Sequence, residues 1–213
     1  MYKRSLRSSQ NPFSEAALLE QIKKYYFVKL LELEKFENVK VFYLKQYESD
    51  FLPHYMICKN YYESASDQIL NAILSVDKDL LQTLKFPNTV MCTCTYRRGD
   101  RVLGIYNREN AFAYLLGSPS SLTAEYIPLV LSIAGDRSDN IPGVKGYGIK
   151  KAVDFVIRYR IPPLLEEIKR KRGVMPSLIQ ENFETVERNY HLISFEEQIR
   201  RLPSHFEQDI LKG

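Results

Sequence analysis

The sequence predicts an α/β protein in which a mixed or parallel sheet is flanked by helices. Three observations predict this class. The 213 residues are 45% hydrophobic, which is enough for a buried core. Short apolar runs of strand length alternate with longer segments of helical periodicity. No internal repeat or low-complexity tract interrupts this alternation.

The N-terminal half alternates between helix and strand patterns. A long amphipathic helix is expected over residues 14–36, with Ser14 as its N-cap. Residues 39–44 form a short apolar run of strand length, and a second helix is expected to begin near Glu48. Pro53 limits how early the backbone bonding of that helix can start.

Two further strand patterns follow. Residues 71–76, NAILSV, predict a buried strand, and residues 89–106 predict a hairpin around the turn-forming RRGD. The strand at 71–76 runs directly into Asp77 and Asp79. Because ligands of open α/β sheets gather at the carboxyl ends of the strands, we expect these two acids to project into a site.

A pair of helices is expected next. The first runs from Thr123 to Ala134 and ends at Gly135, and the second runs from about Gly148 to Arg160. The residues beyond predict further acidic helices in which no chemistry can be identified.

Cysteine content and hydropathy limit where the protein can act. Three cysteines are too few, and odd in number, for a secreted disulfide framework. No apolar run approaches the length of a membrane span, and no hydrophobic core of a signal peptide follows the basic N-terminus. We therefore expect a soluble protein of the cytoplasm, which is the host cytoplasm if the gene is carried by a phage.

Positive charge is concentrated in one window. The net charge is +4, but residues 145–172 hold nine Lys/Arg against three Asp/Glu. Such a run is either a solvated helix face or a surface for a phosphate backbone. The stretch IAGDRSDNIPGVKGYGIKKA, which leads into the window, favours the second interpretation.

Glycines and lysines in this stretch have the composition of a phosphate-binding turn. A turn between two helices directs backbone N–H groups and a positive dipole end toward an anion, and glycine permits close approach. Alternatively, the glycines only shape a helix-helix turn. The candidate nucleic-acid contacts here are Gly143, Lys145, Gly146, Gly148, Lys150 and Lys151.

Three acid pairs form a candidate metal cluster. Each pair alone is weak evidence, because acids two or three residues apart often mark only a turn. Several ionised acids in one cleft require divalent cations, and hard oxygen ligands select Mg²⁺ or Mn²⁺. Two such ions, about 3.5–4 Å apart, would activate water against a phosphodiester. The candidate ligands are Glu48, Asp50, Asp77, Asp79, Asp136 and Asp139.

These motifs resemble the 5′-nuclease family of flap endonucleases and 5′–3′ exonuclease domains of bacterial DNA polymerases, especially its phage-encoded members. GDRSDNIPGVKGYGIKKA resembles the family's helix-hairpin-helix signature, and SVDKDLLQ resembles its metal-binding strand end. The resemblance implies a PIN-like nuclease domain and a helix-3-turn-helix DNA-binding region. We place them at residues 1–118 and 119–213. It also implies two metal ions and a possible K⁺ at the turn.

Two weaker motifs depart from the family pattern. YESDF resembles the start of the family's Glu-Ala-Asp-Asp helix, but Phe51 stands in place of the last acid. YKRSLR resembles the segment at the base of the arch through which these enzymes thread a 5′ end, and Lys3 matches the lysine that contacts the scissile phosphate. Leu6 stands where arginine is expected, so Arg4 or Arg7 is the candidate substitute.

The resemblance also implies a missing segment. Family members place a strand with an Asp-Gly signature and another aspartate ahead of the arch, whereas this sequence begins at the arch. A sheet without that strand should have unpaired backbone groups and an apolar gap. We therefore expect a split enzyme, in which a second polypeptide supplies this segment.

Two functions fit these motifs. The first is a Mg²⁺-dependent 5′ nuclease of DNA replication, with Lys3, Asp77 and Asp79 in catalytic positions. It would act on branched or 5′-ended DNA or on an RNA/DNA hybrid. The second is a catalytically incomplete DNA-binding subunit that uses the helix-hairpin-helix turn as a clamp. A scaffold whose acids are only turn residues would require three motifs to match in order by accident.

Overall fold

The computed structural model describes residues 15–42, 50–63, 69–97, 100–207 and 210. The chain divides into two compact units, which are Met1–Tyr47 with His205–Gly213, and Glu48–Ser204. The boundary predicted at residue 118 stays a prediction.

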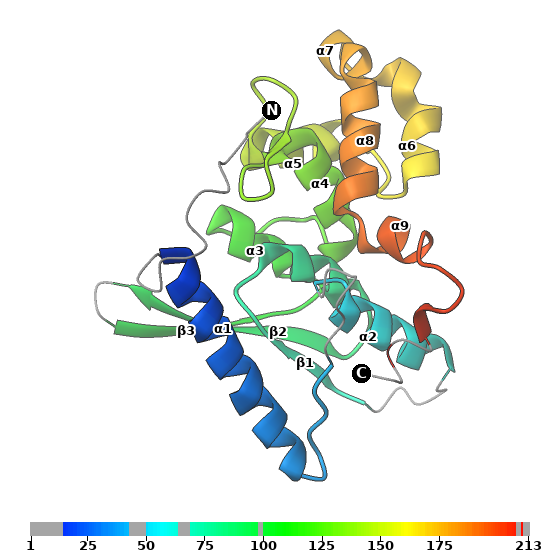
Figure 1. The fold of residues 1–213 in the computed structure, drawn as a ribbon. Helices are drawn as coiled ribbons and strands as arrows, with labels where there is room; N and C mark the ends of the chain where they lie inside the picture. The colour runs from blue at the N-terminus through cyan, green and yellow to red at the C-terminus, as the bar shows by residue number, and fades with distance from the viewer. Residues whose placement is uncertain (1–14, 43–49, 64–68, 98–99, 208–209, 211–213) are drawn as a thin grey trace. The chain divides into compact units, whose positions relative to one another are not determined.

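In the first unit, α1 spans Glu15–Glu32 and continues into the 3₁₀ turn η1, Leu33–Lys35. Helix α1 is the blue helix of Figure 1. It agrees with the helix predicted for residues 14–36, whose proposed N-cap lies outside the described residues. The strand predicted for 39–44 is not observed over residues 39–42, and the remainder of that range is outside the described part of the chain.

The second unit contains a three-stranded mixed sheet, formed by β1 (Asn71–Leu74), β2 (Thr89–Arg97) and β3 (Asp100–Tyr106). The strand order is β1-β2-β3, with β1 parallel to β2 and β2 antiparallel to β3. Figure 1 shows the three strands below α3, α4 and α5. The mixed sheet and the hairpin over 89–106 are confirmed.

The two faces of this sheet differ. Ile73 and Met91 are neighbours in the register and are buried on the face that carries the 3₁₀ helix η2, Lys78–Lys85. On the opposite face Leu74 is 81% exposed and Ile105 is 68% exposed. The prediction that residues 71–76 form a buried strand is therefore wrong for one face, although the strand itself is present.

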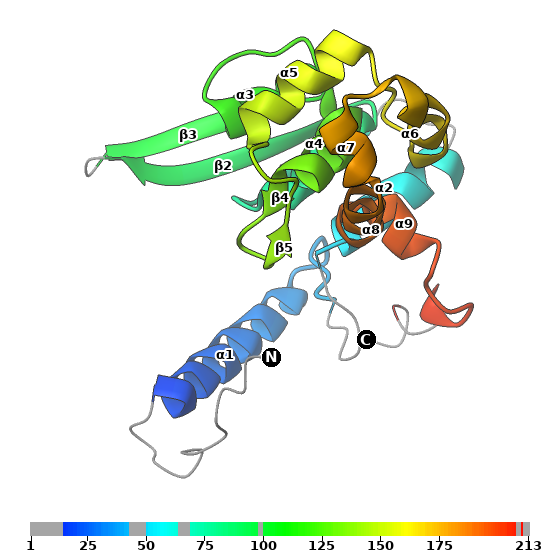
Figure 2. The same ribbon diagram turned by 90° about the horizontal axis from the view of Figure 1, so that it is seen from above.

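A buried helix lies at the centre of the helical layer. Helix α4, Ile127–Ala134, follows the 3₁₀ turn η3, Ala124–Tyr126, and packs between α5 (Ile149–Tyr159) and α8 (Phe183–Ile193). Figure 2 shows α4 between these two helices. Both predicted helices, over 123–134 and 148–160, are confirmed.

Shorter elements complete this unit. Helix α2 (Leu52–Glu63) has Pro53 in its first turn, where a proline costs no hydrogen bond. The others are α3 (Ala111–Leu116), α6 (Leu165–Lys171), η4 (Arg172–Val174), α7 (Ser177–Glu181) and α9 (Phe195–Ile199). Within the described ranges, no helix has both the length and the apolar character needed to cross a membrane.

Candidate metal centre and the adjacent glycine turn

The end of β1 presents two aspartates in different ways. Asp77 is the N-cap of η2, and its Oδ1 accepts a hydrogen bond of 3.0 Å from the Asp79 N–H. The Asp77 N–H in turn donates to Ser75 Oγ at 3.1 Å. Such local capping starts the helix immediately after the strand. Asp77 therefore holds the backbone in place, and Asp79 is the acid that the first turn of η2 presents.

A small hairpin carries the second pair of acids. Strands β4 (Gly135–Asp136) and β5 (Ile141–Pro142) are antiparallel and follow directly from α4. Asp136 Oδ1 accepts from the N–H and the Oγ of Ser138, at 3.0 and 2.6 Å. These bonds fix the turn that carries Asp139.

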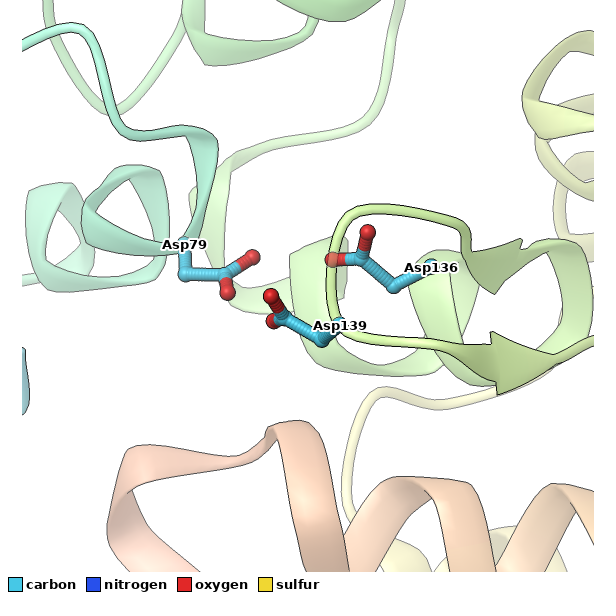
Figure 3. Close-up of side chains that lie close together, drawn as sticks. All are labelled: Asp79, Asp136 and Asp139. Carbon is cyan, nitrogen blue, oxygen red and sulfur yellow. The ribbon is translucent and has the colours of Figure 1, made fainter. Parts of the chain in front are cut away.

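Three of the acids lie together. Asp79, Asp136 and Asp139 each offer a carboxylate oxygen, and these oxygens lie within 4.8 Å of one another. Figure 3 shows their side chains pointing toward one another, Asp79 from η2 and the other two from the hairpin turn. Asp136 is buried, Asp79 is half-buried and Asp139 is exposed, so the group opens to solvent on one side. An all-oxygen set with one open side fits a hard divalent cation.

Lys78 lies among these acids. Its Nζ is 2.6 Å from Asp136 Oδ2 and 3.8 Å from Asp79 Oδ1, and it donates to Ser138 Oγ at 2.7 Å. One ammonium group therefore partly neutralises three carboxylates. The group would carry a net charge of about −2 with all three ionised, which a divalent cation would balance.

The pKa values of two acids move in opposite directions. Burial raises the pKa of Asp79 to about 7; Lys78 opposes this rise, and neighbouring acids, Asp136 foremost, reinforce it. Burial alone would also raise the pKa of Asp136, but hydrogen bonds from Lys78 and Ser138 lower it below its usual value. Asp79 Oδ1 is buried and has no hydrogen-bond partner among the described residues. A cation at this oxygen would supply the missing partner, so the residues fit a metal.

The other predicted ligands lie elsewhere or outside the description. The Asp77 carboxylate is not part of the group of three, and Asp50 is exposed in the turn before α2. Phe51 is 4% exposed in the core, so the position where the family pattern has an acid is here a packing position. The remaining predicted site residues lie outside the described part of the chain, and they are Lys3, Arg4, Arg7 and Glu48.

Gly143 has a packing role. A Cβ at Gly143 would lie 2.2 Å from the backbone C and O of Ala134, and one at Gly135 would lie 2.3 Å from the Gly143 nitrogen. No real Cβ tolerates such distances. The two glycines therefore allow the hairpin backbone to pack directly against the end of α4.

The turn before α5 is open. Gly146 has φ +87°, which favours glycine, and a Cβ at Gly146 or Gly148 would meet nothing within 4 Å. The turn is anchored by the Val144 N–H, which donates to the Ile133 carbonyl at 2.8 Å. Gly148 is the N-cap of α5, so the first amides of that helix have no partner within it. Three exposed lysines surround this turn, and they are Lys145, Lys150 and Lys151.

Sequence reasoning missed Lys78 and Ser138. Lys78 stands between two candidate acids in the sequence, but alternating charges are also typical of a solvated turn. Ser138 lies two residues after Asp136, a spacing at which an aspartate commonly accepts from the backbone. That spacing was the available signal for the turn.

Known proteins resemble this chain in sequence and in fold. DNA polymerase I of Borreliella burgdorferi is 31% identical over 171 residues, which is 76% of this chain and 16% of that protein. A 5′-3′ exonuclease of Mycoplasma pneumoniae is 28% identical over 130 residues, which is 60% of this chain and 42% of that protein. No family model matches.

The solved structures match over nearly the whole chain. A variant of the bacteriophage T5 D15 flap endonuclease, in a pseudo-enzyme-product complex with DNA and metal ions, superposes with a TM-score of 0.68 at 20% identity. That match covers 95% of this chain and 69% of the T5 chain. The chain belongs to the 5′-nuclease family. A T5 5′-exonuclease structure with bound zinc gives a TM-score of 0.60 at 21% identity, over 86% of this chain and 62% of that chain.

Membership in the 5′-nuclease family accounts for the mixed sheet, the flanking helices and the acidic cluster together. The chain spans less than half the length of the sequence relatives named above.

Proposed function

We propose that this chain is a structure-specific 5′ nuclease, acting as a 5′–3′ exonuclease or flap endonuclease on the phosphodiesters of DNA or of an RNA/DNA hybrid. The observation that supports it is the carboxylate group of Asp79, Asp136 and Asp139, two of which lie on the hairpin that leads to an open glycine turn with exposed lysines. A cation site and an anion site that are adjacent in the chain suit a reaction at a phosphodiester.

The proposed cofactor is a pair of Mg²⁺ or Mn²⁺ ions. When bound, such ions lower the pKa of a coordinated water and stabilise the leaving oxygen. Asp79, Asp136 and Asp139 would hold one ion. Asp77, Asp50 and Glu48 are the proposed ligands of the other, and Lys3 is the proposed contact to the scissile phosphate. Lys78 keeps Asp136 ionised and would move its ammonium group aside when a divalent cation enters.

The glycine turn is the proposed duplex contact. Gly146, Gly148 and the first amides of α5 would donate to phosphate oxygens, and a K⁺ bound by the turn would add to the positive charge. Lys145, Lys150 and Lys151 would add contacts that do not depend on base sequence. Binding should therefore weaken steeply with salt, because phosphate contacts release counterions.

A second polypeptide segment is proposed to cover the open face of the sheet. Leu74, Leu103 and Ile105 are 68–81% exposed on one continuous face, since Leu74 pairs with Cys92, Cys92 with Ile105, and Cys94 with Leu103. Among the described strands, none pairs with the outer edge of β1. An exposed apolar face beside an open strand edge suits an added strand.

Cleavage of a 5′-flap DNA substrate in Mg²⁺ or Mn²⁺ tests the enzymatic proposal. Asp79→Asn and Asp136→Asn should each lower the rate by about 100-fold or more, because each removes a charged ligand. Asp100→Asn, at an exposed position on β3, is the matched control and should leave the rate unchanged. Equal activity of Asp79→Asn and the Asp100→Asn control would rule out the proposed metal centre.

The same assay tests the second polypeptide. The double variant Leu74→Lys, Leu103→Lys should lose any stimulation that a covering segment provides. If the chain alone cleaves at a rate that this variant does not change, the segment is not needed for activity.

A DNA-binding subunit without catalysis is the second candidate. The observation that favours it is Phe51, which occupies a core position in place of an acid. It predicts that no preparation cleaves while duplex binding persists. In that case Lys150→Ala and Lys151→Ala should weaken binding to all sequences alike. Calorimetry with Mn²⁺ separates both candidates from a scaffold, which would bind no Mn²⁺.

A further inference from the structure

Lys78 lies in the middle of the acidic group. It is the residue between Asp77 and Asp79 at the start of η2, and its Nζ reaches the hairpin that follows α4. This nitrogen lies 2.6 Å from Asp136 Oδ2 and 3.8 Å from Asp79 Oδ1, and it donates to Ser138 Oγ at 2.7 Å. The ammonium group therefore joins two elements that are 60 residues apart in the sequence.

The contacts of this ammonium group are those of a bound cation. All three partners are oxygen atoms, and two of them belong to carboxylates of the proposed metal centre. The Asp136 side chain is 1% exposed and that of Asp79 is 17% exposed, so water screens these contacts only in part. Asp79 Oδ1 has no hydrogen-bond partner among the described residues, and the ammonium group offsets its charge from a longer distance. A cation of the protein itself thus serves the same oxygens that a metal ion would use.

Another lysine of the same unit makes an ordinary surface contact. Lys169 Nζ lies 3.1 Å from Glu166 and 2.8 Å from Glu187, and those two side chains are 73% and 32% exposed. Exposed ion pairs contribute little to stability, whereas the loss of one partner of a buried pair leaves an uncompensated charge. Lys78 belongs to the second kind, because Asp136 is the buried acid of its group.

A divalent cation and the Lys78 ammonium group compete for these oxygens. Mg²⁺ would bind a carboxylate oxygen at about 2.1 Å. With Nζ 2.6 Å from Asp136 Oδ2, the two cations would then lie less than about 5 Å apart, and they would repel each other strongly in a partly buried site. The ammonium group must therefore leave the carboxylates when the metal ion binds. The Lys78 side chain is 25% exposed, and its flexible four-carbon stem can carry the charge into water.

We propose that Lys78 is the resident cation of this centre and sets the metal concentration at which the centre fills. The proposal rests on the metal centre proposed above and assigns the control of its affinity to one residue. Metal binding is then an exchange, in which the incoming ion replaces the contacts that Lys78 gives up. The factor by which Lys78 weakens metal binding should match the factor by which it stabilises the metal-free chain, because linked equilibria are reciprocal.

Removal of the lysine charge should therefore have two effects of opposite sign. In Lys78→Met the metal-free chain loses the contact that offsets the buried Asp136 charge, so its free energy of unfolding should decrease. The same variant should bind Mn²⁺ about tenfold more tightly, which corresponds to about 1.4 kcal/mol, because no contact has to be broken first. A lysine that served only the fold would, when removed, weaken both stability and metal binding.

Calorimetry of the full chain with Mn²⁺, after removal of metal by a chelator, measures the affinity. The titration is made at pH 8, because burial raises the pKa of Asp79 to about 7 and its carboxylate should be ionised. Lys169→Met removes an exposed lysine that also contacts two carboxylates, so it is the matched control and should leave the Mn²⁺ affinity unchanged. Thermal unfolding gives the second readout. Lys78→Met should melt a few degrees below the wild type in chelator, and saturating Mn²⁺ should remove or reverse that difference.

A second variant and a measurement on the wild type guard against a loss of folding in Lys78→Met. Lys78→Gln removes the charge and keeps a donor for Ser138 Oγ, and it should also tighten Mn²⁺ binding. In the wild type, ¹⁵N NMR follows the ammonium signal of Lys78, which is assigned by its absence from Lys78→Gln. Mg²⁺ should broaden this signal, because the group leaves its partners and exchanges protons with water.

The outcomes separate the role of Lys78 from the metal centre itself. Tighter Mn²⁺ binding by both Lys78 variants, with the Lys169→Met control unchanged, supports the exchange. If the wild type binds Mn²⁺, Asp79→Asn abolishes that binding, and both Lys78 variants bind no more tightly than the wild type, the role of Lys78 is overturned and the metal centre stands. Absence of Mn²⁺ binding by the wild type and by every variant would overturn both proposals.

Discussion

The two faces of the three-stranded sheet carry the same class of side chain and have opposite environments. On one face, Ile73 and Met91 are buried on the side of the sheet that η2 packs against. On the other, Leu74 and Ile105 expose more than two thirds of their surface. In the strand register, Ile73 lies beside Met91, and Leu74 and Ile105 lie on either side of Cys92.

This difference distinguishes the face of the sheet on which packing is complete from the face that can bind a further segment. Apolar side chains that are buried contribute roughly 1.5–3 kcal/mol each to folding, whereas exposed ones contribute little. The closed face should therefore carry the stability of the sheet. The open face, next to the unpaired edge of β1, should carry association.

The largest expected effect is on the free energy of unfolding, and it distinguishes the two faces of the sheet. Met91→Ala removes a fully buried side chain and should lower the free energy of unfolding by about 2–5 kcal/mol. Leu74→Ala, on the opposite face of the sheet, should change the free energy of unfolding by less than about 0.5 kcal/mol. Urea unfolding followed by circular dichroism measures both. Similar losses for the two variants would mean that the open face is covered in solution.

A second prediction concerns the titration of His54, which lies next to η2. His54 is bonded to Thr83 of η2, and its pKa is about 3 in the folded chain against 6.5 when unfolded. Between these values the unfolded chain binds a proton that the folded chain does not, so stability is full above pH 6.5 and falls as the pH decreases. The expected slope is about 1.4 kcal/mol per pH unit, or about 2 kcal/mol between pH 6.5 and 5.

His54→Gln is the control, since it removes the titration and keeps a polar group near Thr83. The difference in unfolding free energy between the wild type and this variant, measured at several pH values, isolates the histidine from the acids. A difference that does not vary with pH would show that His54 takes up its proton in the folded chain as readily as in water.

Much of the fold was accessible from the sequence because local patterns and tertiary packing agree there. The hairpin over 89–106 and the helices over 123–134 and 148–160 follow from alternation, helical spacing and glycine ends. The burial predicted for 71–76 holds on the face of Ile73 and is wrong for the face of Leu74. An apolar run indicates a strand, but it does not say whether a second layer covers each face.

The sequence predicted the acids of the site but not the arrangement of their side chains. Asp79, Asp136 and Asp139 belong to the predicted ligand set and lie together, while their ligand function stays a prediction. Asp77 was placed with them because both acids follow the strand. Its carboxylate instead caps η2, and the spacing of two acids does not reveal which of them the helix start will use.

The three glycines of the turn illustrate the same limit. Spacing treats Gly143, Gly146 and Gly148 alike. In the structure Gly143 packs against the backbone of Ala134, whereas space is open around the other two. Close approach between two backbones is a tertiary property, so a single sequence carries little sign of it.

A smaller effect is expected at Gly104, which pairs with Thr93 on the closed face. A Cβ there would lie 2.8 Å from Thr93 Oγ1 and from a ring carbon of Tyr106, so both side chains would have to shift. Gly104→Ala should therefore cost about 1 kcal/mol in unfolding free energy. Ile105→Ala on the open face is the matched control and should cost less. The reverse order would mean that β3 twists away from the layer beneath it.

The smallest effect on stability is expected on the open face of the sheet, where a substitution should have its greatest effect on association. Leu103 is 71% exposed on the open face, so Leu103→Lys should change the free energy of unfolding by less than about 0.5 kcal/mol. A charge in an apolar patch opposes contact with another apolar surface, so the same variant should weaken any self-association or binding of a covering segment. Sedimentation velocity at several concentrations measures the association, and urea unfolding measures the stability. A loss of stability without a change in association would assign Leu103 to the core of the unit, and the distinction between the two faces would then fail.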